Sequence, residues 1–234
     1  MEVHAHAHTA DPGIHRGRKK WTHYFWEFLM LFLAVFCGFL AEYQLEHKIE
    51  KDREKQFINS LAADLKDDIA KTGAYSEREQ GNIRLLDTLC VYLDNPALAR
   101  ERTDIIYYAA RVGPRTSPFV SNSRTFDQLR NSGAFRLIRN ITTSNRIMEH
   151  YSRIPHIRLL ENNFYREFDY YKDAAAAVID PGVYRRQEDA NGTIKGSNDN
   201  PQLLSYDKAL LKKMEFHAVQ MNGSRRSIIV LLRS

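Results

Sequence analysis

Alternate histidines near the N-terminus form the first group of side chains whose type and spacing could support chemistry. They are His4, His6 and His8. Imidazole is a good ligand for zinc, copper and nickel. The run has no surrounding residues that would orient the rings, so we expect weak, adventitious metal affinity, with a functional metal site as the alternative. We therefore predict no dedicated metal site and no cofactor.

A polar segment in the middle of the chain could bind an anion. Residues 115–124, RTSPFVSNSR, are rich in turn formers and predict a loop, and a short helix follows. Polar loops on rigid scaffolds often carry function. The alternative, which we prefer, is that these residues cap helices and face solvent. The residues that would line a ligand loop are Asn122, Arg124, Thr125, Arg130 and Arg136.

An ionisable residue, Glu27, lies inside the apolar stretch WTHYFWEFLMLFLAVFCGFLAEY, residues 21–43. A carboxylate within a membrane span is a functional hypothesis by default. It could pair with His23 four residues earlier, meet a partner's basic residue, or carry a proton. The simpler interpretation, which we prefer, places Glu27 at the headgroup boundary, where the start of a helix favours negative charge.

The stretch that contains Glu27 predicts a transmembrane helix. At ~1.5 Å per residue it would be about 34 Å long, enough for a hydrocarbon core of roughly 30 Å. Phe39 stands where a cleavable signal needs a small residue, so we expect an anchor that is retained. The basic residues Arg16, Arg18, Lys19 and Lys20 precede it. The positive-inside rule then predicts a cytoplasmic N-terminus and a soluble domain on the outer, periplasmic side of the inner (plasma) membrane.

Small residues share one face of this helix, because Ala34, Cys37, Gly38 and Ala41 recur at steps of three and four. Ala34 and Gly38 form a small-xxx-small pair, which permits close approach of two helices. The face could be an association seam, or the small residues could be scattered by chance. Both interpretations stay open at this point.

The rest of the chain predicts an all-α fold in which the transmembrane helix continues into a long helix, followed by an antiparallel helical bundle. Residues 1–20 would be a disordered basic, His-rich tail, and 44–72 a helical stalk that Gly73 ends. The bundle would occupy residues 73–234, and Pro155 should kink or split its long helix. Its other predicted features are helices at 76–93, 96–112 and 204–221, a helix opened by a capping box at Thr125–Gln128 and closed by Gly133, a loop at 180–201, and a break at Gly223.

Composition and motifs exclude several functional classes. The formal charge of +5 could suggest nucleic acid. The basic residues are mixed with acids along the chain, however, so we predict no nucleic acid and take the lipid bilayer as the nearer partner. The sequence contains no P-loop, no G-x-S-x-G and no H-E-x-x-H motif, and we predict that the protein is not an enzyme.

One segment, NSRTFDQLRNSGAFRLIRN at residues 122–140, has the form aromatic-x-x-Leu-x-x-x-Gly-x-x-x-x-Ile-x-Asn. Its positions are held by Phe126, Leu129, Gly133, Ile138 and Asn140. With the basic tail and the apolar stretch, it resembles an uncharacterised bacterial family of small single-pass inner-membrane proteins with a helical soluble domain. The resemblance covers residues 21 to about 151 and implies the architecture but no chemistry. The His-rich tail and the 180–201 loop depart from it.

These observations favour a non-enzymatic, membrane-anchored helical protein. We expect it to self-associate or to dock to another envelope protein. The alternative is a helical domain that senses an anion or a small molecule and acts through a partner.

Overall fold

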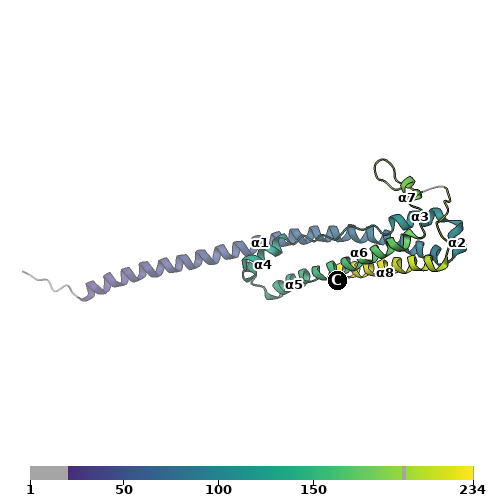
Figure 1. Ribbon diagram of the computed structural model, residues 1–234. Coiled ribbons are helices and arrows are strands. Elements are labelled where there is room, and N and C mark those ends of the chain that lie inside the picture. Colours follow the sequence, from purple (N-terminus) through teal and green to yellow (C-terminus); the bar gives the residue numbers. More distant parts are fainter. Residues whose placement is uncertain (1–20, 197–198, 234) are drawn as a thin grey trace, which may run out of the picture. The chain divides into compact units, whose positions relative to one another are not determined.

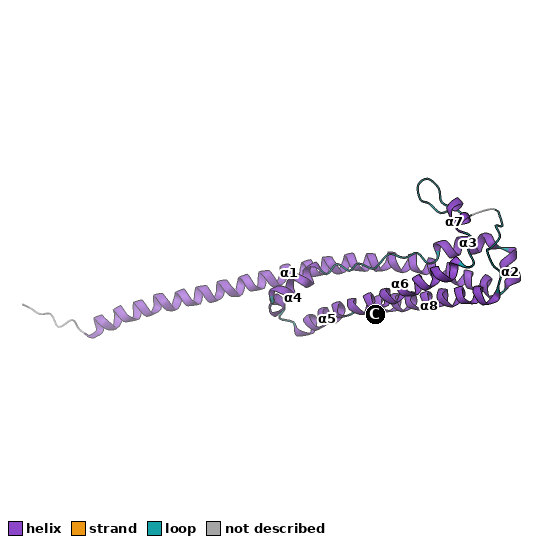
Figure 2. Ribbon diagram, in the orientation of Figure 1, coloured by secondary structure: helices purple, strands orange, loops and turns teal. Residues whose placement is uncertain are grey.

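The computed structural model describes residues 21–196 and 199–233, and over these ranges its regular elements are helices (Figure 2). The all-α prediction is therefore confirmed for the described part of the chain. The predicted tail, with His4, His6 and His8, lies outside it. The boundary between two compact units falls between Arg53 and Glu54, and each unit is described by itself.

The first helix, α1, spans Trp21–Asp94 without interruption. The predicted break at Gly73 is wrong, and the helix expected from residue 76 belongs to α1. An interior glycine costs about 1 kcal/mol relative to alanine, and burial of Tyr75, Ser76 and Glu79 just beyond Gly73 outweighs that cost. Residues 44–72 all lie in α1, and those from Glu54 onward belong to the second unit. The helical stalk at 44–72 stays a prediction.

The second unit contains the remaining helices (Figure 1). They are α2 (Pro96–Glu101), α3 (Thr103–Val112), α4 (Arg124–Ser132), the short 3₁₀ helix η1 (Ala134–Leu137), α5 (Ile141–Ser152), α6 (Ile154–Ala176), α7 (Pro181–Gln187) and α8 (Lys208–Arg233).

Proline lies at the start of two helices, at positions where the sequence predicted a helix start or an interruption. Pro96 begins α2, and the Asn95 side chain accepts a hydrogen bond from the Ala97 amide. Pro155 lies in the first turn of α6, so the long helical run is split there. The helix expected over 96–112 is two helices, α2 and α3, because Arg102 leaves helical geometry.

Glycine marks one helix end and fails to mark another. Gly133 follows α4 with φ of 68°, a left-handed conformation, so the predicted C-terminal glycine is confirmed. Gly223, by contrast, lies inside α8, and the predicted break there is wrong. The helix continues because Asn222, Arg225 and Ile228 are all buried against the rest of the unit. The predicted loop at 180–201 also contains a helix, α7.

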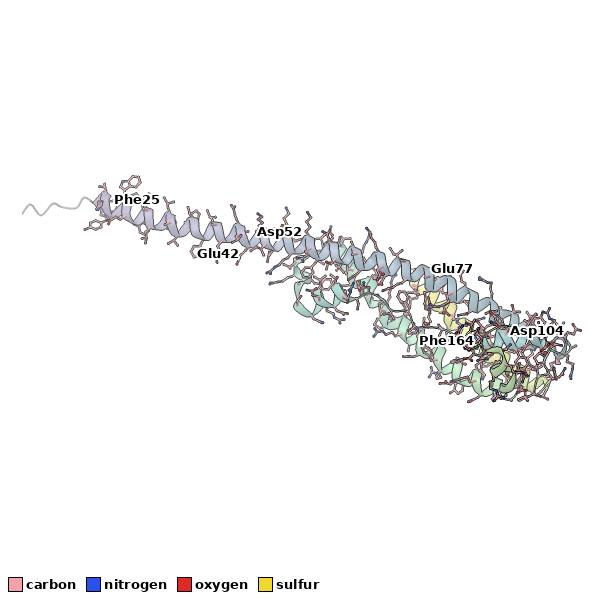
Figure 3. The ribbon with its side chains drawn as sticks, turned by 90° about the horizontal axis from the view of Figure 1, so that it is seen from above. Phe25, Glu42, Asp52, Glu77, Asp104 and Phe164 are labelled. Atoms are coloured by element: carbon pink, nitrogen blue, oxygen red, sulfur yellow. The ribbon has the colours of Figure 1, made fainter. Side chains whose placement is uncertain are left out.

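The main hydrophobic core joins the last turns of α1 to α3, α6 and α8. Leu89, Ile106, Tyr171 and Met214 are among its buried side chains. Helices α6 and α8 lie side by side, and Figure 3 shows Phe164 between the helices of this unit. A smaller core under α4 and α5 is formed by Leu61, Leu129, Ile138 and Tyr151. A third cluster joins Tyr75, Ile157 and Ile228.

Candidate functional site

The start of α1 is the only helix segment of the described residues that is long and apolar enough to cross a membrane. None of its most apolar window is buried within the chain. Phe25 projects freely from the helix (Figure 3). A row of large apolar side chains exposed in this way marks a surface that water does not normally cover.

The predicted association face is uncovered. Ala34, Cys37, Gly38 and Ala41 are all exposed, and a β-carbon built on Gly38 would meet nothing within 4 Å. The opposite side of the helix carries stacked aromatic rings four residues apart, at Phe28, Phe32 and Phe36. The small residues therefore form a smooth face that could admit a second helix.

Glu27 has a partner on its own helix. Its Oε1 lies 3.1 Å from Nε2 of His23, and both side chains are more than half exposed. This is the first of the pairings that the sequence suggested. The His23 imidazole balances the charge of the Glu27 carboxylate only when the imidazole is protonated.

The polar loop is fixed to α1 by two aspartates. Asp64 and Asp68 are four residues apart, so they share a face of the helix. Asp68 accepts hydrogen bonds from the Ser121 hydroxyl (2.6 Å) and the Asn122 amide (2.7 Å). Asp64 accepts from the Thr125 hydroxyl (2.6 Å) and the Thr125 amide (3.1 Å).

These bonds replace the predicted capping box, which is wrong. Thr125 lies inside α4, whose N-cap position is Ser123, and its hydroxyl serves Asp64 instead. Burial raises the pKa of Asp64, but the hydrogen bonds from Thr125 and the charge of Arg124 outweigh it, so the net pKa lies below the usual value. The carboxylate is thus held in its ionised form.

The other residues of the predicted ligand loop also have partners in the fold, with one exception. Asn122 donates to Asp67 and accepts from Arg124. Arg130 pairs with Asp127 at 2.9 Å. Arg136 is exposed on η1. Because the α1 carboxylates surround the loop's donors, a bound anion would be repelled there, and the geometry favours a structural role for the loop.

A buried ion pair was not singled out in the sequence. Glu79 of α1 is fully buried, Arg225 of α8 is 1% exposed, and Arg225 Nε donates to Glu79 Oε2 at 2.8 Å. Thr116 donates to the other carboxylate oxygen, and Arg225 Nη2 donates to the Arg115 carbonyl. The guanidinium lies 4.7 Å from the centre of the Phe164 ring.

The sequence offered only a weak signal for this pair. Glu79 is one of many charged residues on a long helix, and Arg225 follows the glycine at which a break was expected. The pair connects α1, α8 and the chain after α3.

A second buried carboxylate, Glu161 of α6, lies near the ion pair and gives a pH-dependent prediction. Burial raises its pKa, although the Phe119 amide donates to Oε1 at 2.6 Å. Folding therefore favours the protonated acid, and stability is lost as the pH rises through the folded pKa. We expect Glu161→Gln to be more stable than the wild type at pH 7, because glutamine keeps an oxygen acceptor without the charge.

That advantage should vanish below about pH 4, where the wild-type acid is protonated. Thermal unfolding of the full-length protein at both pH values measures it. The control is Glu149→Gln, an exposed glutamate paired with Arg153, which should change stability by only a few tenths of a kcal/mol at either pH. Equal stabilities of Glu161→Gln and the wild type at pH 7 would contradict the prediction.

Over its described residues, then, the chain is an all-helical protein with one exposed apolar helix segment and a second unit held by buried polar pairs. No protein-family model matches its sequence, and comparisons with curated proteins and with solved structures found no match.

Proposed function

We propose that this protein is anchored in the inner (plasma) membrane by residues 21–43 and acts by association, with a second copy of itself or with another envelope protein, and not as an enzyme. The observation that carries the proposal is the apolar window of α1, none of which is buried. In this proposal the N-terminus is cytoplasmic and the helical unit lies on the periplasmic side.

The free-energy cost of exposing this segment to water supports the proposal that it is a membrane anchor. Fourteen large apolar side chains are exposed between Trp21 and Tyr43. Burial of one such side chain is worth about 1.5–3 kcal/mol, so the segment represents on the order of tens of kcal/mol. That exceeds the net stability of a typical domain, about 5–15 kcal/mol. A bilayer covers a helix of this length and composition without any further partner.

The proposed domain is an antiparallel helical bundle. Polar pairs between α1 and α8 join Glu79 to Arg225, Asp87 to Asn222 and Asp94 to Lys212. Residue numbers rise along one helix while they fall along the other, as an antiparallel arrangement requires. This geometry supports a rigid unit carried outside the membrane.

Association through the small-residue face is tested by crosslinking at Cys37, the cysteine on that face. Cys90 serves as an internal contrast, because burial, with Glu215 and Asp87 nearby, raises the pKa of its thiol to about 12. We expect mild oxidation of the full-length protein in membranes to give a Cys37-linked dimer. Gly38→Leu should lower its yield at least about fivefold, because the added side chain separates the helices.

Two variants control this experiment. Phe32→Leu changes a side chain on the opposite face and should leave the yield unchanged, and Cys37→Ser should abolish the product. A monomer in every variant, with no envelope protein recovered by crosslinking in membranes, would remove association from the proposed function.

The alternative, a ligand-binding domain, is favoured by one observation. The second unit contains an apolar cavity between α3, α6 and α7, and none of the five residues of the predicted ligand loop lines it.

A further inference from the structure

A cavity of about 310 Å³ lies between α3, α6 and the start of α7. This volume falls at the lower end of the range for small-molecule sites, about 300–1,000 Å³. Its walls are mainly apolar. They comprise the aromatic rings of Phe168, Tyr171 and Tyr184 and the methyl groups of Ala110, Ala175 and Ala176.

Fixed aromatic rings and small side chains shape this cavity. The Tyr171 hydroxyl donates to the Ala110 carbonyl at 3.0 Å, which ties α6 to α3. The Tyr184 ring of α7 packs edge-on against Tyr107, with centroids 6.0 Å apart. Alanines stand where larger side chains would fill the space. The cavity is therefore preformed, which lowers the entropic cost of binding a ligand.

Two cations, Arg111 and Lys172, also line the cavity. Arg111 is held in place, because its terminal nitrogens donate to the Tyr184 carbonyl and to Glu188. Lys172 pairs with Asp169 at 2.7 Å, and both side chains are more than half exposed. An exposed pair of this kind is worth about 0–1 kcal/mol, so Lys172 can exchange Asp169 for another carboxylate at little cost.

We propose that this cavity binds a small amphipathic anion, an apolar chain bearing one carboxylate, such as a medium-chain fatty acid. The chain packs against the aromatic rings and alanines, and Lys172 binds the carboxylate at the edge of the cavity. This inference goes beyond the proposed association through the membrane helix and does not depend on it.

The test uses full-length protein in lipid nanodiscs and decanoate that carries a photoreactive diazirine at its chain end. After illumination, mass spectrometry maps the labelled residues. We expect label on the peptides that contain Phe168, Tyr171 and Tyr184, and unlabelled decanoate should suppress it. Label on residues 21–43 reports probe dissolved in the bilayer and serves as the internal reference.

Substitutions at two neighbouring alanines distinguish probe bound in the cavity from probe bound elsewhere on the unit. Ala176 lines the cavity but is exposed, so Ala176→Trp should block the cavity without disturbing the core. We expect it to lower labelling at the cavity about tenfold relative to residues 21–43. Ala177→Trp, one residue further and not among the lining residues, should leave labelling unchanged.

The charge is tested in the same way. Lys172→Met should weaken decanoate competition about tenfold, the value of one charge-assisted hydrogen bond. Lys213→Met on α8, exposed and outside the cavity, should have no effect. Label confined to residues 21–43, or cavity label that Ala176→Trp leaves intact, would overturn the proposal. Competition by decanol equal to that by decanoate would overturn the assignment of an anion.

Discussion

Arg225→Ala is expected to lower the free energy of unfolding of the helical unit by about 3–5 kcal/mol, the largest effect that we predict for a single substitution. The change leaves the fully buried Glu79 carboxylate without its buried cation. Its remaining side-chain donors are the Thr116 hydroxyl at 3.1 Å and the half-exposed Arg78 guanidinium at 3.3 Å. It also removes the packing of the guanidinium on Phe164. Burial itself lowers the pKa of Arg225, and Glu79 partly offsets that shift, so the two residues depend on each other.

The measurement is hydrogen exchange of the full-length protein in nanodiscs, read at amides of α8 and of the last turns of α1. Arg226→Ala is the matched control, because Arg226 is the next residue, is half exposed and pairs with Asp87 at 2.8 Å. It should cost less than about 1 kcal/mol. Equal losses for Arg225→Ala and Arg226→Ala would show that the buried pair does not stabilise the unit.

A double variant separates the loss of the ion pair from the cost of an unpaired buried charge. In Glu79→Leu with Arg225→Met, no buried ion is left unpaired. We expect the double variant to be more stable than Arg225→Ala alone, because replacing a buried pair by apolar residues is often neutral, whereas removing one partner is not. A double variant that is less stable than Arg225→Ala would contradict this account.

Asp64→Ala is expected to destabilise the segment from Ser121 to Ser132 by about 2–4 kcal/mol. The aspartate accepts two hydrogen bonds from Thr125, which is buried, and one from Arg124. Loss of the acceptor leaves the buried Thr125 donors unsatisfied, and each such group costs about 1–3 kcal/mol. We expect faster hydrogen exchange at the amides of α4, with the core of α6 and α8 unaffected.

Asp67→Ala is the matched control for Asp64→Ala. Asp67 is exposed, and its bonds to Lys71 and Asn122 lie at the surface, so its loss should cost less than about 1 kcal/mol. The difference between wild type and Asp64→Ala should also depend on pH. The folded pKa of Asp64 is lowered, so its contribution is present above the unfolded value of about 3.9 and is lost as the pH falls through the folded pKa. A difference that is unchanged in acid would contradict the hydrogen-bonding role of the carboxylate.

The sequence by itself determined the features that depend on neighbouring residues. The apolar stretch at 21–43 follows from composition, and so does the small-residue face that contains Gly38. The start of α2 at Pro96, the split at Pro155 and the left-handed Gly133 follow from local backbone chemistry. Each depends on a few consecutive residues, so each is visible without the fold.

Only the tertiary structure decided how the helices continue and which polar groups meet. Gly73 and Gly223 do not end their helices, because buried contacts from distant segments exceed the local cost of glycine. Glu79 and Arg225 are 146 residues apart, and Asp64 and Thr125 are 61 apart, so no local pattern marks either pair. The apolar cavity likewise exists only where three helices meet. No sequence pattern marks the alanines that line it, because only the packing of the helices brings them together.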